Sequence, residues 1–569
     1  MFRYSTFALA LVVSALCAGA EDLLVLQDLS GRQGGRLVYA QRSEPKTFNP
    51  IFAADSVSRE AIGMMMADLV HINRYTQRTE PALAKSWTVS PDGRRYALEL
   101  RRGIRFSDGQ PFSADDVVFS FRVYLDTALD SPQRDLLMPG GKPIVVKKVG
   151  DCRVEFDLPV RYAAAERLFD GFAILPRHLL EPAYKTGKLA EAWGLRTPPA
   201  AITGLGPFRL KQNIPGQRLV LERNPYYWKA DKNGIRLPYL NEVDLTQAGS
   251  EDMQVLRFES GESDVIRRVG AHDFAVLEKE SRRRGYTVSD LGPGMEYTSL
   301  YFNLDPAAGR PGFLRRRSFR QAVSTAIDRN ALVRLVYGGH AAPLGTPVPP
   351  GNKAWVDASL RPPVPSVSAA RALLSSGGFK WSGGNLLDPA GQRVEFSIIT
   401  SAGNDDRVQM ATLIQADLKE LGIQVDVVPL EFRSLLDRVL RTHQFDTALM
   451  SMADGDADPN PDMNTWMSDG GNHLWNTAEK SPSMPWEAEI DRLMRQQMTV
   501  PDYARRKKMY DLVQQILMEH MPLVPLVSPD ILVGAKRNLG NFRPALMDHY
   551  TLWNIEELYW RELRTGERP

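Results

Sequence analysis

Hydrophobic side chains recur at every second position in the first third of the chain, in short runs that are bounded by turns. Tyr96, Leu98 and Leu100 show this spacing, which is typical of a strand with one buried face. The Ser-Pro-Asp-Gly segment at 90–93 precedes them and has Pro and Gly at positions that favour a turn. The pattern therefore predicts β-hairpin structure from Trp87 onward.

The spacing becomes helical after a second turn at 107–110. Ser113 and Asp116 lie three residues apart and form a helix-start signature, in which side chains bond the exposed backbone groups of the first turn. The apolar residues behind them share one helical face: Val117, Phe121, Tyr124 and Leu125. Together with the hairpin, this helix predicts a compact α+β unit.

Strand and helix patterns alternate in the second half of the chain. The predicted order is a strand at 394–400, a helix at 407–421 ended by Gly422, a strand from Ile423, a helix at 432–441 and a strand at 445–450. A strand, a helix and a strand of these lengths form a βαβ crossover. We therefore expect a right-handed crossover in a largely parallel sheet.

The first residues resemble a secretory signal peptide. Arg3 supplies a positive charge, residues 7–16 are apolar except for one serine, and Ala18-Gly19-Ala20 has small residues at a peptidase site. We predict that residues 1–20 are removed and that the mature protein is periplasmic. Acylation of Cys17 is the alternative, which the flank supports poorly because Leu16 stands where a small residue is usual.

Charge and motifs exclude several functions. The net charge of +2, with acids and bases interspersed, gives no electrostatic footprint for nucleic acid. The chain has no nucleophile elbow, zinc-protease helix, phosphate-binding loop or dinucleotide-binding loop, and its 8 histidines lack ligand spacing. We therefore predict no enzyme activity, no cofactor and no metal site. An exported hydrolase that uses two carboxylates distant in sequence stays open.

Many short segments match, in order, one family signature. Two of them are Pro-Ala-Leu-Ala-Lys-Ser-Trp at 81–87 and Asp-Gly-Gln-Pro-Phe at 108–112. The others lie at 92–93, 100–107, 114–117, 204–208, 223–228, 260–264, 320–323, 326–329, 505–510 and 522–526. Each segment alone is weak evidence for a family, because most of the segments are also explained as turns or as aromatic residues that pack in a core. In number and order, they resemble family 5 extracellular solute-binding proteins, the peptide receptors of ABC importers.

The resemblance implies a mixed α/β (α+β) fold of the periplasmic-binding-protein type II, cluster C. Such a fold has two main lobes with a hinge and a ligand cleft, plus an inserted domain. The implied division is a flexible leader at 21–35, lobe I at 36–80, 200–291 and 525–569, lobe II at 81–199, and lobe III at 292–524. The ligand is expected between lobes I and III, which close around it by hinge motion.

The most polar segment of lobe III follows its last predicted strand. In peptide receptors of the family, an aspartate of the matching segment binds the α-ammonium of the ligand, because a buried cation needs an opposite charge. That aspartate stands three residues before an acid that is followed by proline. Here Asp458-Pro459 supplies the acid and proline, but Gly455 holds the aspartate position, so Asp454 or Asp456 is the candidate. A solvated acidic turn is the alternative.

Lobe I contributes Glu44 and Thr47 to the candidate site, on an irregular segment between a strand and a helix. Backbone groups there and at 447–453, including Met452 and Ala453, are expected to bond the main chain of an extended peptide. Hydrated pockets would then accept varied side chains. The alternative for Glu44 is an exposed loop charge.

Four aromatic residues are further candidates: Tyr124, Tyr301, Trp466 and Trp475. Burial in an ordinary core is the alternative for each of them.

The resemblance implies a monomeric receptor that captures a peptide and delivers it to an inner-membrane ABC permease with cytoplasmic ATPases. A non-peptide solute, such as a sugar, an opine or a metal chelate, is the alternative ligand.

Overall fold

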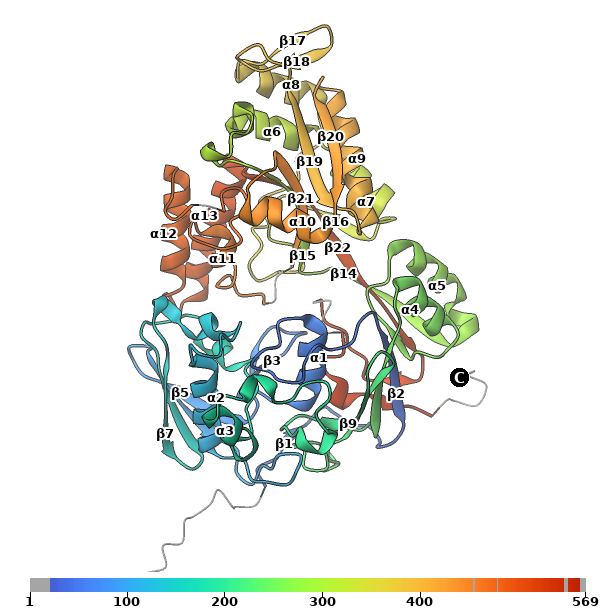
Figure 1. The fold of residues 1–569 in the computed structure, drawn as a ribbon. Coiled ribbons are helices and arrows are strands. Elements are labelled where there is room, and N and C mark those ends of the chain that lie inside the picture. Colours follow the sequence, from blue (N-terminus) through green and yellow to red (C-terminus); the bar gives the residue numbers. More distant parts are fainter. Residues whose placement is uncertain (1–20, 454–455, 478, 547–550, 563–569) are drawn as a thin grey trace, which may run out of the picture.

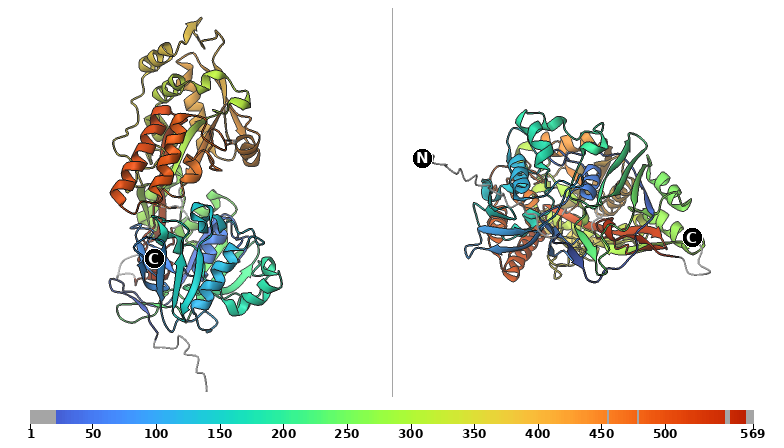
Figure 2. Two further views of the ribbon diagram at one scale, coloured as in Figure 1. Left: turned by 90° about the vertical axis from the view of Figure 1, so that its left-hand side faces the viewer. Right: turned by 90° about the horizontal axis from the view of Figure 1, so that it is seen from below.

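The computed structural model describes residues 21–453, 456–477, 479–546 and 551–562. The predicted signal peptide, Cys17 and Asp454 lie outside these residues. The described chain forms two bodies (Figure 1), which Figure 2 shows stacked along the long axis of the molecule. We call residues 21–293 and 531–562 the lower body and residues 294–530 the upper body.

One twelve-stranded mixed sheet of the described residues runs through both bodies. From the upper to the lower edge its strands are β20 (Gln424–Leu430), β19 (Glu395–Ser401), β21 (Thr447–Ala453), β15 (Glu296–Phe302), β22 (Leu523–Lys536), β13 (Val265–Ile266), β2 (Arg36–Gln41), β12 (Glu242–Gln247), β10 (Arg218–Arg223) and β9 (Phe208–Ile214). Strands β14 (Tyr286–Pro293) and β16 (Ala341–Pro343) also pair with β22.

Strand β22 belongs to both bodies. Its first residues pair with β15 and β16 in the upper body, and its last residues pair with β13 and β14 in the lower body. The strand is buried at both ends but only half-buried at Pro529 and Asp530, where it passes from one body to the other. Strands β14 and β22, paired side by side, therefore form the natural hinge (Figure 1).

The predicted βαβ crossover is present in the upper body. Strands β19 and β20 are parallel, and α9 (Asp405–Lys419), which joins them, packs on both. Strand β21 adds a third parallel neighbour, but β15 and β22 run antiparallel. The expectation of a largely parallel sheet is therefore wrong. The sheet is mixed because β15 runs against the parallel strands of the upper body, and β22 runs against those of the lower body.

Further helices surround the upper part of the sheet. They are α6 (Arg317–Ala326), α7 (Arg329–Val336), α8 (Val367–Ser376), α10 (Phe432–Leu436), α11 (Met463–Trp466), α12 (Pro485–Gln497) and α13 (Tyr503–His520). A π-helical turn at Asp437–Arg441 continues α10, so the helix predicted at 432–441 is present with a change of hydrogen-bond pattern. A small hairpin joins β17 (Lys380–Ser382) to β18 (Asn385–Leu387).

The α+β unit predicted near residue 100 forms part of the lower body. Its antiparallel sheet has the order β5 (Ala84–Val89), β6 (Arg95–Leu100), β8 (Arg153–Asp157) and β7 (Val145–Gly150), next to α2 (Ala114–Leu125) and α3 (Arg177–Lys185). The other helices of the lower body are α1 (Ser56–Met65), α4 (Glu251–Glu259) and α5 (Ala271–Arg284). The short pairs are β3 (Val70–Ile72) with β4 (Thr79–Pro81) and β23 (Leu539–Gly540) with β24 (Tyr559–Trp560).

A large hydrophobic core joins most of the lower body, and a smaller cluster around Phe258 and Phe274 packs α4 and α5. Leu37 of β2, Leu98 of β6, Phe121 of α2 and Leu558 near the C-terminus are all fully buried in the large core. The segment at 81–199 is thus not separated from its neighbours by solvent. The upper body has its own clusters, one of them around Phe319. The lobe boundaries expected from the sequence stay predictions.

The leader expected to be flexible at 21–35 is folded onto the lower body. Its strand β1 (Leu24–Leu26) pairs in parallel with β11 (Lys229–Asp231), and the backbone N–H of Gly34 bonds the carbonyl of Tyr239. Leu23, Leu24 and Leu26 pack against the lower core, and this contact explains the order despite the Gly-rich end of the segment.

The helix start predicted at Ser113 is confirmed, and it generates a test of stability. Ser113 and Asp116 form a capping box at the start of α2. Replacing Ser113 by Ala should lower the free energy of unfolding by about 1 kcal/mol, because a backbone N–H loses its acceptor. Urea unfolding measures the change. Ser375→Ala, at an exposed position of α8, is the control, and an equal loss in both variants would contradict the prediction.

Candidate functional site

The parallel strands of the lower body end at one edge, and charged residues follow them. Strands β2, β12 and β13 run in the same direction, so their carboxyl ends share that edge. Arg42 follows β2 directly and forms an ion pair of 2.6 Å with Glu251, which begins α4 after β12. Ligands of open α/β sheets bind outside such carboxyl ends.

Strands β19, β20 and β21 of the upper body also end at one shared edge. This edge approaches the lower body at α9, the helix after β19. Burial raises the pKa of the Asp406 carboxyl on that helix, and the nearby charge of Glu251 raises it further. Because Glu251 belongs to the lower edge, the two carboxyl edges face one another on either side of the hinge.

The acidic segment after β21 contacts the lower body directly. Asp456 forms an ion pair with Arg167 of the 3-10 helix Ala165–Phe169, and both side chains are largely buried. Burial raises the pKa of Asp456, whereas the Arg167 guanidinium opposes that rise. Nearby, the backbone N–H of Ala163 bonds the carbonyl of Met498 at 2.7 Å. One predicted amine anchor therefore already holds a cation that comes from the other body.

Asp458 has a different role, inside the upper body. Its two carboxylate oxygens accept hydrogen bonds of 2.8 and 2.9 Å from Arg506 of α13, and both side chains are about 6% exposed. The same guanidinium lies 4.9 Å from the ring centre of Trp355. The acid of the Asp-Pro motif therefore joins the acidic segment to α13. No local spacing in the sequence pointed to Arg167 or Arg506.

The lower edge carries a second buried ion pair. Arg267, directly after β13, donates two hydrogen bonds of 3.2 and 2.8 Å to Glu60 of α1. The guanidinium also lies over the ring of Tyr39 of β2, at 5.2 Å from its centre. This arrangement joins α1 to the carboxyl ends of β2 and β13. A buried, hydrogen-bonded ion pair therefore lies at the lower edge.

Glu44 and Thr47 lie after β2, as predicted, and both make local contacts. Glu44 is half-buried, and its carboxylate accepts a hydrogen bond of 2.8 Å from the backbone N–H of Gly216 in the β9–β10 turn. The Thr47 hydroxyl accepts one of 3.0 Å from the backbone N–H of Asn49. Both side chains hold the loop in shape in this structure. Their contact with a ligand stays a prediction.

The four aromatic candidates lie in cores. The exposed fractions are 0% for Tyr124, Tyr301 and Trp475 and 2% for Trp466. Tyr124 packs edge-to-face on Phe172 in the lower body. This placement corrects the expectation that these rings line the ligand site, because a ring without exposed surface offers a ligand nothing to contact. Aromatic residues are large and apolar, and packing them in a core is their commonest use.

Met452 and Ala453 are the last residues of β21 and reach the interface between the bodies. Met452 is half-buried, Ala453 is exposed, and they pair with Tyr297 and Glu296 of β15. On the other side, β21 pairs with β19 only at Thr447 and Ala448. The end of β21 therefore has a strand neighbour on one side only.

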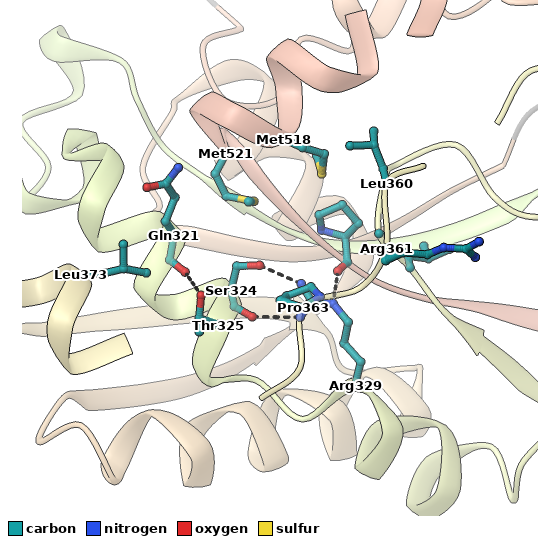
Figure 3. A pocket seen from close by; sticks show the side chains of 13 residues that line it. Gln321, Ser324, Thr325, Arg329, Leu360, Arg361, Pro363, Leu373, Met518 and Met521 are labelled. Carbon is teal, nitrogen blue, oxygen red and sulfur yellow. Dashed lines mark hydrogen bonds between the residues drawn. The ribbon is translucent and has the colours of Figure 1, made fainter. Parts of the chain in front are cut away.

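A cavity of about 360 Å³ lies elsewhere, inside the upper body (Figure 3). Arg329 lines it without a carboxylate among the lining residues, and burial lowers its pKa to about 9. Its guanidinium donates to the carbonyl of Pro525 at 2.7 Å and to the backbone and hydroxyl oxygens of Ser324 at 2.9 Å (Figure 3). These bonds fix α6 and α7 to β22, which is a structural role.

Three groups of side chains in the described part of the chain have the spacing that a metal ion needs: Asp68, His71 and Asp170; Asp290, His340 and Asp530; and His473, Glu479 and Glu487. Arg74 already pairs with Asp170 in the first group. In the second, at the hinge, His340 bonds Asp290 at 2.7 Å. The third group is fully inside the upper body.

Comparison with known proteins identifies the family. Residues 78–473, more than half of the chain, match the family described as bacterial extracellular solute-binding proteins, family 5 Middle. The protein belongs to this family. The resemblance inferred from the short segments is therefore confirmed. Family 5 proteins are receptors and not enzymes, in agreement with the expectation from the motifs.

The relatives of this family 5 receptor extend over almost its whole length. The oligopeptide-binding protein AppA of Bacillus subtilis is 26% identical over 535 residues, which are 93% of this chain and 92% of AppA. The structure of AppA in complex with a nonapeptide has a TM-score of 0.72 and 23% identity, covering 94% of this chain and 100% of that chain. NikA from Brucella suis in complex with Fe(III)-EDTA has a TM-score of 0.78 and 22% identity, covering 93% and 100%.

These structures confirm the expected fold of cluster C binding proteins. They also show that the fold holds chemically different ligands, since one of the two contains a peptide and the other a metal chelate. Among the residues that the structure describes, none of the helices has the length and apolar character that crossing a membrane requires.

The two ion pairs of the acidic segment generate a prediction about stability. Asp458→Asn should lower the free energy of unfolding by about 3–5 kcal/mol, because Arg506 is left as a buried cation without a carboxylate. Asp456→Asn should cost less, because its pair lies at the interface between the bodies and water reaches it more readily. Urea unfolding followed by tryptophan fluorescence compares them. A larger loss for Asp456→Asn would contradict this assignment.

Proposed function

We propose that this protein captures peptides between its two bodies in the periplasm and delivers them to an inner-membrane ABC permease with cytoplasmic ATPases. The observation that carries the proposal is the pair of facing carboxyl edges, joined by the β14–β22 hinge. A ligand between these edges would contact both bodies. Its binding would therefore favour the closed arrangement that a permease can recognise.

The open side of β21 supports a peptide as the ligand. Beyond Ala448 this strand pairs with β15 but no longer with β19, so backbone groups near Met452 and Ala453 face the interface without a strand partner on that side. An extended peptide would add there as a further strand, through main-chain hydrogen bonds that do not depend on its sequence. AppA, which has the same fold, was crystallised with a nonapeptide.

We assign the α-ammonium of the peptide to the acidic segment, with Asp454 as the first candidate. Asp456 already pairs with Arg167, so an ammonium would have to displace that guanidinium. Asp458 is held by Arg506 inside the upper body and is not a candidate. Glu44 and Thr47 would contribute from the lower edge, through the loop after β2.

A non-peptide solute is the second candidate, and the fold supports it as well. NikA has a slightly higher TM-score with this chain than AppA, and its structure contains Fe(III)-EDTA. Native mass spectrometry of the protein purified without unfolding would separate the candidates. Co-purified peptides of mixed mass support our proposal, whereas one constant non-peptide mass would contradict it.

Variants of the acidic segment test how the peptide is oriented. Asp454→Asn should weaken the binding of a free-amine peptide at least tenfold, because a buried ammonium loses its charged partner. An N-acetylated peptide of the same sequence should lose nothing further from that change. Isothermal titration calorimetry measures both affinities.

Asp426→Asn is the matched control for this experiment. Asp426 is exposed on β20, and its replacement removes the same charge. The affinity of this variant for the free-amine peptide should therefore equal that of the parent protein. If Asp456→Asn weakens binding and Asp454→Asn does not, Asp456 is the anchor and exchanges Arg167 for the ligand. Equal affinity of all variants for the free-amine peptide would refute an acidic anchor in this segment.

A further inference from the structure

One histidine and two glutamates meet deep in the upper body, outside the proposed ligand site. His473 lies in the loop between α11 and α12, Glu479 lies in the same loop, and Glu487 lies in the first turn of α12. The exposed fractions of their side chains are 0%, 4% and 3%. One ligand atom from each of the three lies within 4.8 Å of the others.

The imidazole of His473 has no hydrogen-bond partner on either nitrogen. Its Nε2 atom faces Glu479 Oε2 at 3.6 Å and Glu487 Oε1 at 3.9 Å, and both distances exceed a hydrogen bond. A fully buried ring with two unpartnered nitrogens is unusual, since buried polar atoms are nearly always bonded. The nitrogen and the two oxygens instead lie within 4.8 Å of one another.

Neutral donors hold the two carboxylates in position. Trp475 Nε1 donates to Glu487 Oε1 at 3.1 Å, and the hydroxyl of Ser483 donates to Glu487 Oε2 at 3.2 Å. Asn476 Nδ2 donates to Glu479 Oε2 at 3.0 Å. Such donors orient the ligands of a metal ion, but they do not cancel two negative charges. Glu487 also closes the capping box of α12, which fixes its place.

The charge of this cluster needs a cation. No lysine or arginine of the described residues forms an ion pair with Glu479 or Glu487. Arg320 interacts with Glu487 only through the longer-range attraction of their charges. Two buried carboxylates without a counter-charge are strongly unfavourable. A proton on His473 is therefore one solution, and a metal ion is the other.

We propose that His473, Glu479 and Glu487 bind a divalent cation of the zinc class as a structural site. Zinc binds histidine nitrogen and carboxylate oxygen at about 2.0–2.2 Å, which places neighbouring ligand atoms of a tetrahedron about 3.4 Å apart. The measured separations of 3.6 and 3.9 Å are close to that value and too long for direct bonding. Three protein ligands leave one position for a water molecule.

The metal would fasten the loop after α11 to the start of α12. Trp475 lies between the two, with its ring centre 4.0 Å from that of His473, and Trp466 and Trp486 pack on either side of it. The loop supplies His473 and Glu479, and α12 supplies Glu487, so one ion would add a direct link between elements that already share the hydrogen bonds of Trp475 and Ser483 to Glu487. The site lies away from the facing edges, so it does not hold cargo.

The sequence offered no sign of this site, because the ligands lie at irregular spacing in a loop and a helix. The expectation of no metal site rested on that spacing alone. Irregular spacing does not prevent ligation when a fold brings the residues together, as it does here within one buried layer.

The experiment measures zinc and thermal stability in the complete mature protein, without a histidine tag. Protein from zinc-containing medium should contain about one zinc ion per chain by elemental mass spectrometry. Removal of zinc with a chelator should lower the Tm, and added zinc should restore it, because ligand that binds only the folded state stabilises it. Absence of zinc together with a Tm that zinc does not change would overturn the proposal in favour of the imidazolium.

Matched variants place the ion. His473→Gln and Glu479→Gln should lose the bound zinc and the zinc-dependent rise in Tm, whereas Glu489→Gln, which is exposed on the same α12, should keep both. Retention of zinc in His473→Gln would overturn the assignment. Because the zinc content of the parent protein is decisive on its own, a variant that fails to fold leaves the test intact.

Discussion

The antiparallel pairing of β14 with β22 is the constraint on which the arrangement of both bodies depends. Strand β22 pairs with strands of the upper body at one end and strands of the lower body at the other. A paired ribbon of this kind resists sliding, because its backbone hydrogen bonds fix the register. It bends far more easily, and the half-buried Pro529 and Asp530 mark the place. The facing edges can therefore approach one another without changing their lateral alignment.

The contacts away from the hinge have two kinds of partner. Arg167 and Asp456 join different bodies, so a hinge motion would change the distance between them. Arg506 and Asp458 join elements of the same body and stay together during such a motion. Two aspartates separated by one residue thus have different partners: Asp456 forms its ion pair across the two bodies, and Asp458 forms its ion pair within one body. The acidic segment reads as one patch in the sequence, but the fold divides it.

Local structure was largely predictable from the sequence, because its signals lie within a few residues. The capping box at Ser113 and the crossover through α9 are set by side-chain patterns along one stretch of chain. The mixed sheet was missed because the partners of β22 come from 265–302 and 341–343, and pairing over such separations has no local signature. The leader was missed because its order comes from docking onto β11.

The candidate site was less predictable, for a related reason. Short family segments indicated the loops after β2 and β21, but whether a side chain faces a ligand depends on what the fold puts against it. Asp456 meets Arg167, which lies in a segment with no distinctive pattern. Trp475 is an aromatic residue of the type that often lines pockets, yet its indole packs against His473 and two other tryptophans. Only the tertiary contacts distinguish these uses.

The one-sided pairing of β21 leaves an open strand edge at the interface between the bodies. A strand with a free side is a template for any extended chain, including the edge of another folded protein, and exposed edges of this kind promote aggregation. Here the free side lies between two bodies that are held in register by the hinge. In the proposed binding mode, a single extended segment would pair with this edge, whereas a folded sheet would also bring its side-chain layers between the two bodies. The position of this edge between the bodies would then turn a general tendency of strands to associate into selection of a single extended chain.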